Sequence, residues 1–280
     1  MSREPFPRLQ AQGLTIAYDR RVVSADLDLL VPVGGLTAVV GPNACGKSTL
    51  LRTMARLHRP SRGRVLLDGQ DVHRLRTKEV ACRVGLLTQS AEIPDRITVR
   101  DLVARGRSPH QSVFRQWSRA DRDAVDRAME LTRVADLARR PVDELSGGQR
   151  QRVWLALVLA QETETILLDE PITFLDLARQ IEVLELCRRL NRDESRTIVV
   201  VLHDLNLAAR CATHMVVMKD GAVHATGSPE RVLTRELLAE VFDLTALVVP
   251  DPVTGTPMVV PTGLCPDASA ADAGDGRRKP

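Results

Sequence analysis

The fold is decided by the stretch Gly41-Pro42-Asn43-Ala44-Cys45-Gly46-Lys47-Ser48-Thr49. The apolar run from Leu36 to Val40 leads directly into this stretch. The apolar residues after it have the spacing of one face of a helix, namely Leu50, Leu51, Met54 and Leu57. We therefore expect a buried strand, a glycine-rich loop and a helix in immediate succession. Such a loop directs several backbone N–H groups toward one point at a helix N-terminus, and this concavity binds phosphate.

The glycines, the lysine and the serine of this loop have the spacing G-x-x-x-x-G-K-[ST] of the P-loop, in the strand-to-helix context that the motif requires. We expect the Lys47 ammonium to reach the β- and γ-phosphates of a nucleotide. The Ser48 hydroxyl would coordinate the Mg²⁺ ion that bridges these phosphates, and Thr49 would add a hydrogen bond nearer the α-phosphate. The alternative is a glycine turn that caps an ordinary helix, and the flanking elements argue against it.

The composition is that of a soluble globular protein, with 280 residues of which 44% are hydrophobic. The longest apolar stretch, Val153 to Ala160, is far shorter than the roughly 20 residues of a membrane-spanning helix. The segment from Met1 to Pro5 lacks the apolar part of a signal peptide, so we expect a cytoplasmic protein. A net charge of +3 and an aromatic fraction of 2% disfavour a nucleic-acid-binding surface. No C-x-x-C pair suggests a zinc site or a disulfide framework among the cysteines, which are Cys45, Cys82, Cys187, Cys211 and Cys265.

Two segments of strand-like composition, Leu9 to Tyr18 and Leu27 to Val31, precede the loop and predict an antiparallel flap. The ring of Tyr18 either stacks on a purine base or packs as a half-buried strand tyrosine. Beyond the first helix, a strand from Val84 to Leu87 leads to Gln89. The Gln89 amide oxygen either faces Mg²⁺ or the attacking water, or lies exposed in a loop.

A helical pattern from Thr98 to about Ala160 predicts a helical insertion. Phe114 and Trp117 lie within an arginine-dense part of this insertion. Its arginines are Arg100, Arg105, Arg107, Arg115, Arg119 and Arg122. This part is either a solvated face or a docking surface for a partner helix, and the sequence favours neither.

The same insertion contains Leu145-Ser146-Gly147-Gly148-Gln149, followed by a helix that we expect from Val153 to Ala160. Ser146 is a good N-cap, and the two glycines permit close approach of another surface. Free N–H groups at a capped helix start make a second potential phosphate site. It lies about a hundred residues from Lys47, and a nucleotide has a single γ-phosphate. We therefore expect this site to serve a nucleotide that a second copy of the protein holds.

An apolar strand, Thr165 to Leu168, ends in two carboxylates, Asp169 and Glu170. In P-loop proteins an aspartate at a strand end beside the glycine loop holds Mg²⁺, and we assign this role to Asp169. Glu170 can then polarise water for in-line attack. Asp176 is the expected N-cap of a helix from Leu177 to Leu190.

The strand Thr197 to Leu202 carries His203 at its end. Ligands bind at the strand ends of a parallel sheet, so we expect His203 to hydrogen-bond the γ-phosphate. A hairpin around Asp220-Gly221 and two short helices complete this core. From about Leu247 the chain forms a small strand-like appendix, and about fifteen final residues should be disordered because they contain few large apolar groups.

These motifs occur in the order and approximate spacing of the ATP-binding cassette (ABC) ATPases, which the chain resembles over nearly its whole length. The signature Leu145–Gln149 distinguishes this family from other P-loop proteins, because the P-loop alone is also typical of kinases, GTPases and helicases. The resemblance implies an α/β fold, with a RecA-like P-loop NTPase core, an antiparallel β flap and an inserted α-helical subdomain. It assigns residues 7–245 to the ATP-binding domain, with the core in 7–97 and 162–245 and the helical signature subdomain in 98–161. A small extension at 246–264 and a disordered tail at 265–280 follow.

The resemblance also implies ATP and Mg²⁺ as ligands and a homodimer that sandwiches two ATP molecules head to tail. The expected catalytic residues are Glu170, His203 and Gln89, and the expected Mg²⁺ ligands are Ser48, Gln89 and Asp169. The expected ATP-binding residues are Tyr18 and Gly41, Pro42, Asn43, Ala44, Cys45, Gly46, Lys47, Ser48 and Thr49. The partner copy would contribute the signature residues Ser146, Gly147, Gly148 and Gln149, and Asp176 would lie in the D-loop.

A finer resemblance is to the ATPase subunits of bacterial iron-siderophore importers, of the ferric enterobactin and ferric citrate type. It rests on stretches outside the catalytic set, namely residues Leu66–Val72, Thr98–Val103, Arg105–Gln111, His203–Arg210 and Asp251–Pro257. Two departures stand out. The family usually has glycine at the position of Ala44, and Thr-Thr-Tyr or Thr-Ser-Ala at Ile172-Thr173-Phe174. Ala44 adds a methyl group, which disfavours a positive φ there.

This resemblance implies a peripheral ATPase at the cytoplasmic face of the cell membrane, which dimerises on ATP and drives a separate membrane permease served by a substrate-binding protein. An importer ATPase for haem or cobalamin is the alternative within the class. From other classes, a non-transport ABC ATPase acting on DNA or the ribosome would need a coiled-coil insertion or tandem cassettes, and this chain has neither. A nucleotide-binding regulator without turnover is disfavoured by an intact Glu170.

Overall fold

The computed structural model describes residues 7–19, 21–89, 96–111 and 117–265. Phe114 and all of the predicted disordered tail except Cys265 lie outside these residues. The strands of the described part are β1 (Leu9–Tyr18), β2 (Arg21–Val31), β3 (Leu36–Val40), β4 (Arg62–Leu67), β5 (Gln70–Asp71), β6 (Val84–Leu87), β7 (Thr165–Asp169), β8 (Thr197–Val201), β9 (His214–Lys219), β10 (Ala222–Gly227), β11 (Leu244–Pro250) and β12 (Pro257–Leu264). The helices are α1 (Lys47–Met54), α2 (Thr77–Arg83), α3 (Val99–Ala104), α4 (Arg119–Leu131), α5 (Gly147–Ala160), α6 (Leu177–Glu194), α7 (Leu205–Cys211), α8 (Pro229–Val232) and α9 (Arg235–Phe242), with 3₁₀ turns at Arg105–His110, Ala135–Leu137 and Val142–Glu144.

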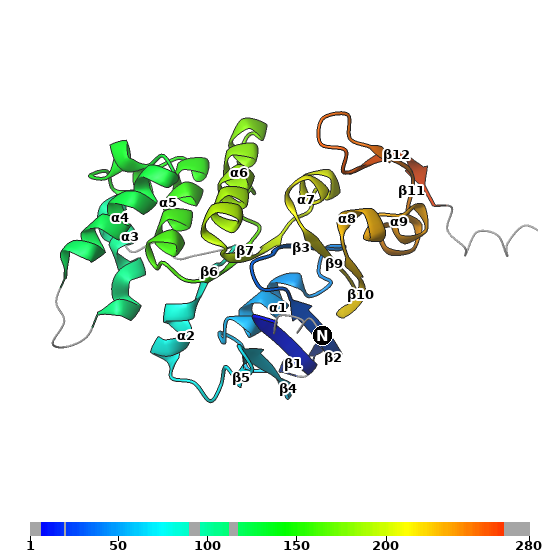
Figure 1. The fold of residues 1–280 in the computed structure, drawn as a ribbon, viewed down its shortest axis with the longest axis horizontal. Helices are drawn as coiled ribbons and strands as arrows, with labels where there is room; N and C mark the ends of the chain where they lie inside the picture. Colours follow the sequence, from blue (N-terminus) through cyan, green and yellow to red (C-terminus); the bar gives the residue numbers. More distant parts are fainter. Residues whose placement is uncertain (1–6, 20, 90–95, 112–116, 266–280) are drawn as a thin grey trace, which may run out of the picture.

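A central sheet with the strand order β10-β9-β3-β8-β7-β6 organises the described part of the chain (Figure 1). Its strands run parallel except β10, which pairs with β9 as the predicted antiparallel hairpin. Strands β3, β7 and β8 are buried along their whole length and largely apolar, because other elements cover both faces of the sheet. Along β3, Ala38 and Val40 join the core on one face, whereas Val39 joins the core on the other.

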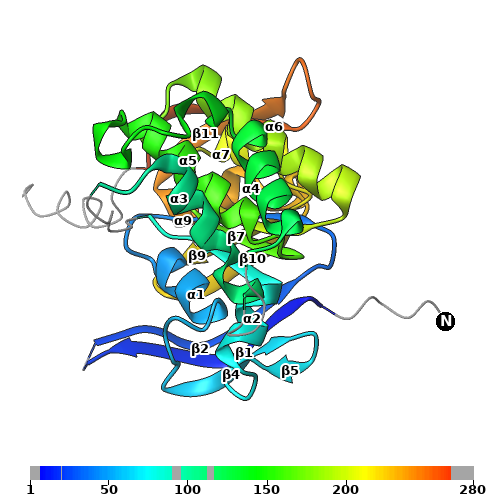
Figure 2. The ribbon, with the colours of Figure 1, turned by 90° about the vertical axis from the view of Figure 1, so that its left-hand side faces the viewer.

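A separate antiparallel sheet, with the order β2-β1-β4-β5, lies with α1 against one face of the central sheet (Figure 2). This is the predicted flap. Its strand β2 begins at Arg21, well before the expected Leu27. Of the additional residues, Arg21, Val22 and Ser24 pair with β1, and the polar Ser24 and Asp26 interrupt the apolar pattern from which the strand was predicted.

The helical insertion covers the other face of the central sheet together with α6 and α7, and all of these elements share one buried apolar cluster. Two boundaries differ from the prediction. Helix α5 begins at Gly147, not Val153, because the Ser146 hydroxyl and the Gln149 side chain form a capping box. Helix α6 continues to Glu194, not Leu190, and ends at Ser195, which has a left-handed conformation.

The arginine-dense part of the insertion is not one solvated face. Arg107 is only 4% exposed, and its guanidinium donates to the buried Asp121 carboxylate at 2.9 Å and to the Ala160 carbonyl at 2.8 Å. It therefore ties the 3₁₀ turn at Arg105–His110 to α4 and to the end of α5. Trp117 is 40% exposed, so the choice between a solvated face and a docking surface stays open for the remaining residues. No helix within the described ranges has the length and apolar character needed to cross a bilayer.

Candidate active site

The glycine-rich loop connects β3 to α1, as predicted. Gly41 and Gly46 have φ angles of 152° and 100°, a region that L residues rarely adopt. A Cβ atom on Gly41 would also lie 2.1 Å from the carbonyl oxygen of Met218 on β9. Ala44 has φ 61°, so the positive φ considered from the sequence is present although the residue is not glycine.

The Lys47 side chain lies folded against this loop. Its ammonium donates to the carbonyl oxygens of Gly41 at 2.9 Å and Pro42 at 2.7 Å, and the residue is only 5% exposed. Burial raises the pKa of the adjacent Cys45 thiol, so this cysteine stays protonated beside the lysine. Carbonyl oxygens are neutral acceptors, and a phosphate group at the loop would give the buried cation a counter-charge.

Asp169 and Ser48 form the part of the site that fits a divalent cation. The Ser48 hydroxyl donates to Asp169 Oδ1 at 2.8 Å, and Asp169 is fully buried. Within the described residues Asp169 Oδ2 has no hydrogen-bond partner. Burial raises the pKa of Asp169, and the neighbouring Glu170 charge adds to this rise. A buried, unpartnered carboxylate oxygen next to a hydroxyl is the oxygen-donor set that Mg²⁺ takes.

The strand order required one adjustment to the expected position of Asp169. Strand β8 lies between β3 and β7, so the strand of Asp169 is not the neighbour of the strand that enters the loop. Ser48, in the first turn of α1, nevertheless reaches Asp169 across this gap. The order β8-β7-β6 also places the three predicted catalytic residues at adjacent strand ends.

Glu170 lies at the centre of these predicted catalytic residues. Its carboxylate accepts hydrogen bonds from Gln89 Nε2 at 2.9 Å and Thr173 Oγ1 at 3.3 Å, and it lies 2.7 Å from His203 Nε2. The Glu170 side chain is 11% exposed and its backbone has φ 52°, an uncommon value for a residue other than glycine. The sequence did not single out Thr173 as a partner of Glu170.

A cavity of about 710 Å³ joins these groups. It is lined by most of the predicted site, namely Tyr18, residues 43–49, Gln89, Glu170 and His203. The ring of Tyr18 packs against His58 with a centroid distance of 4.5 Å. Tyr18 is nevertheless 42% exposed, so its ring is accessible to the purine base of a nucleotide. The lining residues that the sequence did not indicate are Arg21, Val22, Val23, Asp220 and Gly221. They lie at hairpins whose approach to the loop depends on long-range packing, and their residue types carry no chemical signal.

The signature residues lie at a different hollow of about 580 Å³, lined by Ser146, Gly147, Gly148, Gln149, Phe174 and Asp176. One chain therefore does not bring the signature and Lys47 into the same cavity. Gln149 N–H donates to the Ser146 hydroxyl, and Gln149 Oε1 accepts from the Ser146 N–H, which confirms Ser146 as an N-cap. Asp176 is the N-cap of α6, as predicted, and its carboxylate accepts from the Arg179 N–H at 2.9 Å. Phe174 is 84% exposed beside the signature.

Known proteins are similar to this chain in sequence and in fold. The family model described as ABC transporter matches residues 25–173. The ferric enterobactin transport ATP-binding protein of Escherichia coli is 48% identical, over 95% of this chain and 98% of that protein. The iron(3+)-hydroxamate import ATP-binding protein of Bacillus subtilis is 46% identical, over 89% of this chain and 93% of that protein.

A bacterial ABC transporter cassette solved as a dimer is similar in structure, with a TM-score of 0.71 and 25% identity. The match covers 79% of this chain and 98% of the cassette. The predicted ABC ATPase fold is thus confirmed. A matching family model and relatives nearly half identical along almost the whole sequence show that this chain belongs to the ABC transporter family.

Proposed function

We propose that this protein is the ATP-hydrolysing subunit of an importer for iron(III)-siderophore complexes. The cargo is supported by relatives named for ferric enterobactin transport and iron(3+)-hydroxamate import, which are 48% and 46% identical. The chemistry is supported by one observation above all others. Glu170 lies with His203 and Gln89 at the end of a cavity that also contains the phosphate loop and borders the buried Ser48–Asp169 pair.

Each side chain has a role that follows from its contacts. Lys47, whose ammonium already lies against the loop carbonyls, binds the terminal phosphates as a point charge. Ser48 and Asp169 would hold Mg²⁺, which when bound neutralises charge on the phosphate oxygens. Glu170 accepts the proton of the attacking water. His203 orients the Glu170 carboxylate from the neighbouring strand end, and we infer that it would donate to the γ-phosphate when nucleotide is bound.

Gln89 and Tyr18 complete the nucleotide site. Gln89 donates to Glu170 through Nε2, which leaves its Oε1 for the metal or the attacking water. Tyr18 offers a half-exposed ring on which the adenine base stacks, which contributes about 0.5–1.5 kcal/mol beyond the area it buries.

A second copy would complete the γ-phosphate site. The signature hollow presents the N-terminus of α5, a fourteen-residue helix, with two glycines in its first turn. Backbone N–H groups at such a terminus favour an anion. Two copies arranged head to tail would place each signature on the nucleotide bound at the other copy's Lys47. ATP then closes the dimer and hydrolysis releases it, and a membrane permease with its substrate-binding protein uses this cycle. The subunit would work at the cytoplasmic face of the membrane.

Glu170→Gln tests the chemistry, because the amide keeps the size of the side chain and loses the basic oxygen. ATP turnover should fall by about 10²- to 10⁴-fold while nucleotide binding is retained. Glu130→Gln, on the exposed face of α4, is the matched control and should turn over normally. Unchanged turnover in E170Q would remove Glu170 from the role of base.

Two further measurements separate the remaining parts of the proposal. The E170Q protein should form dimers with ATP and Mg²⁺ in sedimentation or light-scattering experiments, and a sample that stays monomeric would contradict the head-to-tail arrangement. Uptake of labelled ferric siderophore, haem and cobalamin should be compared in cells with and without the gene for this chain. If only haem or cobalamin uptake were lost, that compound and not a ferric siderophore would be the cargo.

A further inference from the structure

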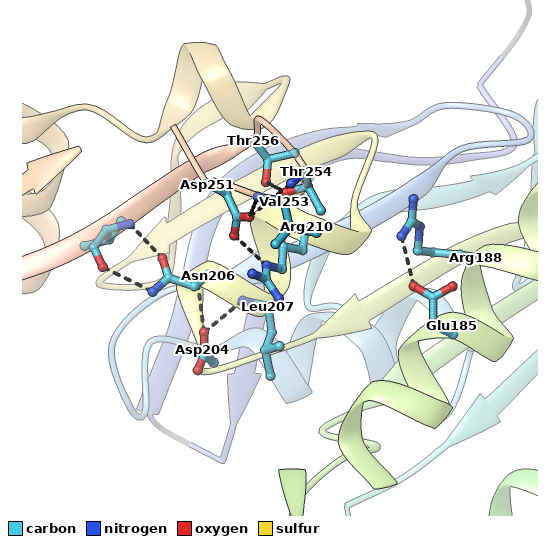
Figure 3. A network of polar contacts seen from close by, with 11 residues as sticks. Glu185, Arg188, Asp204, Asn206, Leu207, Arg210, Asp251, Val253, Thr254 and Thr256 are labelled. Atoms are coloured by element: carbon cyan, nitrogen blue, oxygen red, sulfur yellow. Dashed lines mark hydrogen bonds and ion pairs between the residues drawn. The ribbon is translucent and has the colours of Figure 1, made fainter. Parts of the chain in front are cut away.

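Apart from His203, two of the stretches that relate the chain to siderophore importers have no part in the steps above, yet they lie against each other. Residues His203–Arg210 contain the site histidine and most of α7, and Asp251–Pro257 form the turn of the β11–β12 hairpin. Figure 3 shows the polar contacts that join the helix to this turn. The C-terminal hairpin is therefore attached to the helix that begins just after β8 and His203.

The first contact is at the start of α7. Asn206 Nδ2 donates to the Val259 carbonyl at 3.1 Å, and Asn206 Oδ1 accepts from the Val259 N–H at 2.7 Å. The side-chain amide thus pairs with both backbone groups of one residue of β12, as a neighbouring strand would. The two hydrogen bonds together fix the first turn of α7 against β12.

The second contact is one turn further along the same face, because residues four apart in a helix lie above each other. Arg210 Nε donates to Asp251 Oδ2 at 2.6 Å, and Asp251 is 4% exposed. Asp251 Oδ1 accepts from the N–H groups of Val253 at 2.8 Å and Thr254 at 3.1 Å. The Arg210 guanidinium and the Val253 N–H hold the pKa of Asp251 well below its usual range, so the carboxylate stays ionised. The turn is therefore built to present one fixed anion to Arg210.

Both elements need this contact. Helix α7 has seven residues, and a helix of two turns is not stable by itself. Its apolar face, with Leu207, Ala208 and Ala209, packs into the main core, and the polar face with Asn206 and Arg210 lies on the hairpin. A two-stranded hairpin is likewise marginal alone, and β11–β12 is anchored through buried Ala246 and Val259.

The position of His203 depends on the same helix. On one side, the Leu202 N–H donates to the Val39 carbonyl of β3 and fixes the strand end. On the other side, Asp204 caps α7 through the N–H groups of Asn206 and Leu207. The His203 side chain itself is 47% exposed, so the backbone between these two anchors sets where its ring meets Glu170.

We propose that Asn206, Arg210 and Asp251 are positioning residues for His203, and that the C-terminal hairpin clamps α7 so that the imidazole stays within reach of Glu170 and the γ-phosphate. The inference rests on the proposed function for its effect on catalysis. Its structural part, the dependence of the His203 ring on the hairpin, can be measured without turnover.

The test uses the full chain and compares Asp251→Asn, Asn206→Ala, Arg210→Ala and Arg210→Lys. Arg188→Ala is the matched control, since Arg188 makes an exposed ion pair of 2.9 Å with Glu185 on α6 (Figure 3). The histidine ring resonances are recorded first by NMR, with His203→Ala identifying the signal of His203. D251N and N206A should move the His203 signal, and R188A should leave it in place.

The kinetic arm then separates positioning from general damage. Misplacement of a catalytic group by about 1 Å can cost up to 10²-fold, so we expect D251N, N206A and R210A to lower kcat by about tenfold or more with KM for MgATP within twofold. R210K keeps the ion pair and should retain most of the wild-type kcat. In the His203→Ala background the same substitutions should cause no further loss.

Specific results would overturn the inference. They are a His203 resonance that does not respond to D251N or N206A in folded protein, or equal losses of kcat with and without His203. If D251N does not fold, N206A and R210A carry the same comparison through the other contacts. Failure of the proposed function would look different. Wild-type protein would show no turnover sensitive to E170Q, while the His203 resonance would still report on the hairpin.

Discussion

Asp169→Asn should make the nucleotide-free protein more stable while it removes the response to Mg²⁺. Asp169 is fully buried, its Oδ2 has no partner within the described residues, and Glu170 adds a second carboxylate next to it. The asparagine keeps an oxygen that can accept from the Ser48 hydroxyl, which lies 2.8 Å from Asp169 Oδ1. The substitution therefore removes a poorly compensated charge without removing the hydrogen bond that the aspartate makes.

The magnitude follows from the cost of unpartnered groups. A neutral buried group without a partner costs roughly 1–3 kcal/mol and a charged one costs more, so the exchange should gain about 1 kcal/mol. In a protein of this size that gain raises Tm by about 2 °C. Because burial raises the pKa of Asp169, the folded protein binds the proton of this carboxyl more tightly than the unfolded chain does. Protonation of Asp169 therefore stabilises the fold at low pH, and this stabilisation is lost as pH rises through the raised pKa. The advantage of D169N should accordingly shrink as the pH is lowered.

Thermal denaturation with ATP and either Mg²⁺ or EDTA is the assay. At a ligand concentration about 100-fold above Kd, binding stabilises wild type by about 2.7 kcal/mol, which corresponds to a rise in Tm of about 5 °C. The wild-type rise should depend on Mg²⁺, and the D169N rise should be the same with Mg²⁺ or EDTA. A lower Tm for nucleotide-free D169N, or a full Mg²⁺-dependent increment in that variant, would refute the assignment of this carboxylate to the metal.

Three further predictions test the frame around the site. Arg107→Ala leaves the Asp121 carboxylate buried without its cation, which should cost about 3–5 kcal/mol and lower the urea midpoint, and an unchanged midpoint would contradict this. The Ser118 hydroxyl first, and then the Ser118 N–H and the Arg107 guanidinium, lower the pKa of Asp121 from 3.8 to about 2. Its contribution to stability is therefore present above pH 3.8 and lost as pH falls to about 2, and a stability gap between wild type and Asp121→Asn that stays constant between pH 5 and 2 would count against this. Tyr18→Ala should raise the Kd for ATP by about two- to tenfold with little change in kcat. An unchanged Kd would show that adenine does not stack on this ring.

Much of the site could be predicted because its parts are local. The strand, loop and helix around Lys47 are contiguous in sequence, and each of the other groups directly follows an apolar strand. Gln89 follows β6, Glu170 follows β7 and His203 follows β8. Parallel strands end at the same edge of a sheet, so His203 was expected near Asp169 and Glu170, whereas Gln89 was left open between the metal site and an exposed loop position.

The rest depended on long-range contacts that a local pattern does not contain. Arg107 resembled its exposed neighbours, and its burial depends on Asp121 on another helix and on the Ala160 carbonyl. The insertion of β8 between β3 and β7 follows from pairing of distant strands. Asn206 and Val259 are 53 residues apart, so their contact could not be read from either stretch alone.

The contacts of Glu170 link the three roles that we propose for neighbouring strand ends, namely the base Glu170, the metal ligand Gln89 and the phosphate contact His203. A carboxylate offers about four lone-pair positions, and His203, Gln89 and Thr173 occupy up to three of them, which leaves about one for a water molecule. The Gln89 amide nitrogen donates to Glu170, and in the proposed site its oxygen would be left for a cation at Asp169. A metal that binds the Gln89 oxygen, or a phosphate that binds the His203 imidazole, would each change a hydrogen bond to the Glu170 carboxylate. In the proposed mechanism Glu170 would therefore respond to metal and phosphate together, and its basicity toward water would depend on the positions of Gln89 and His203.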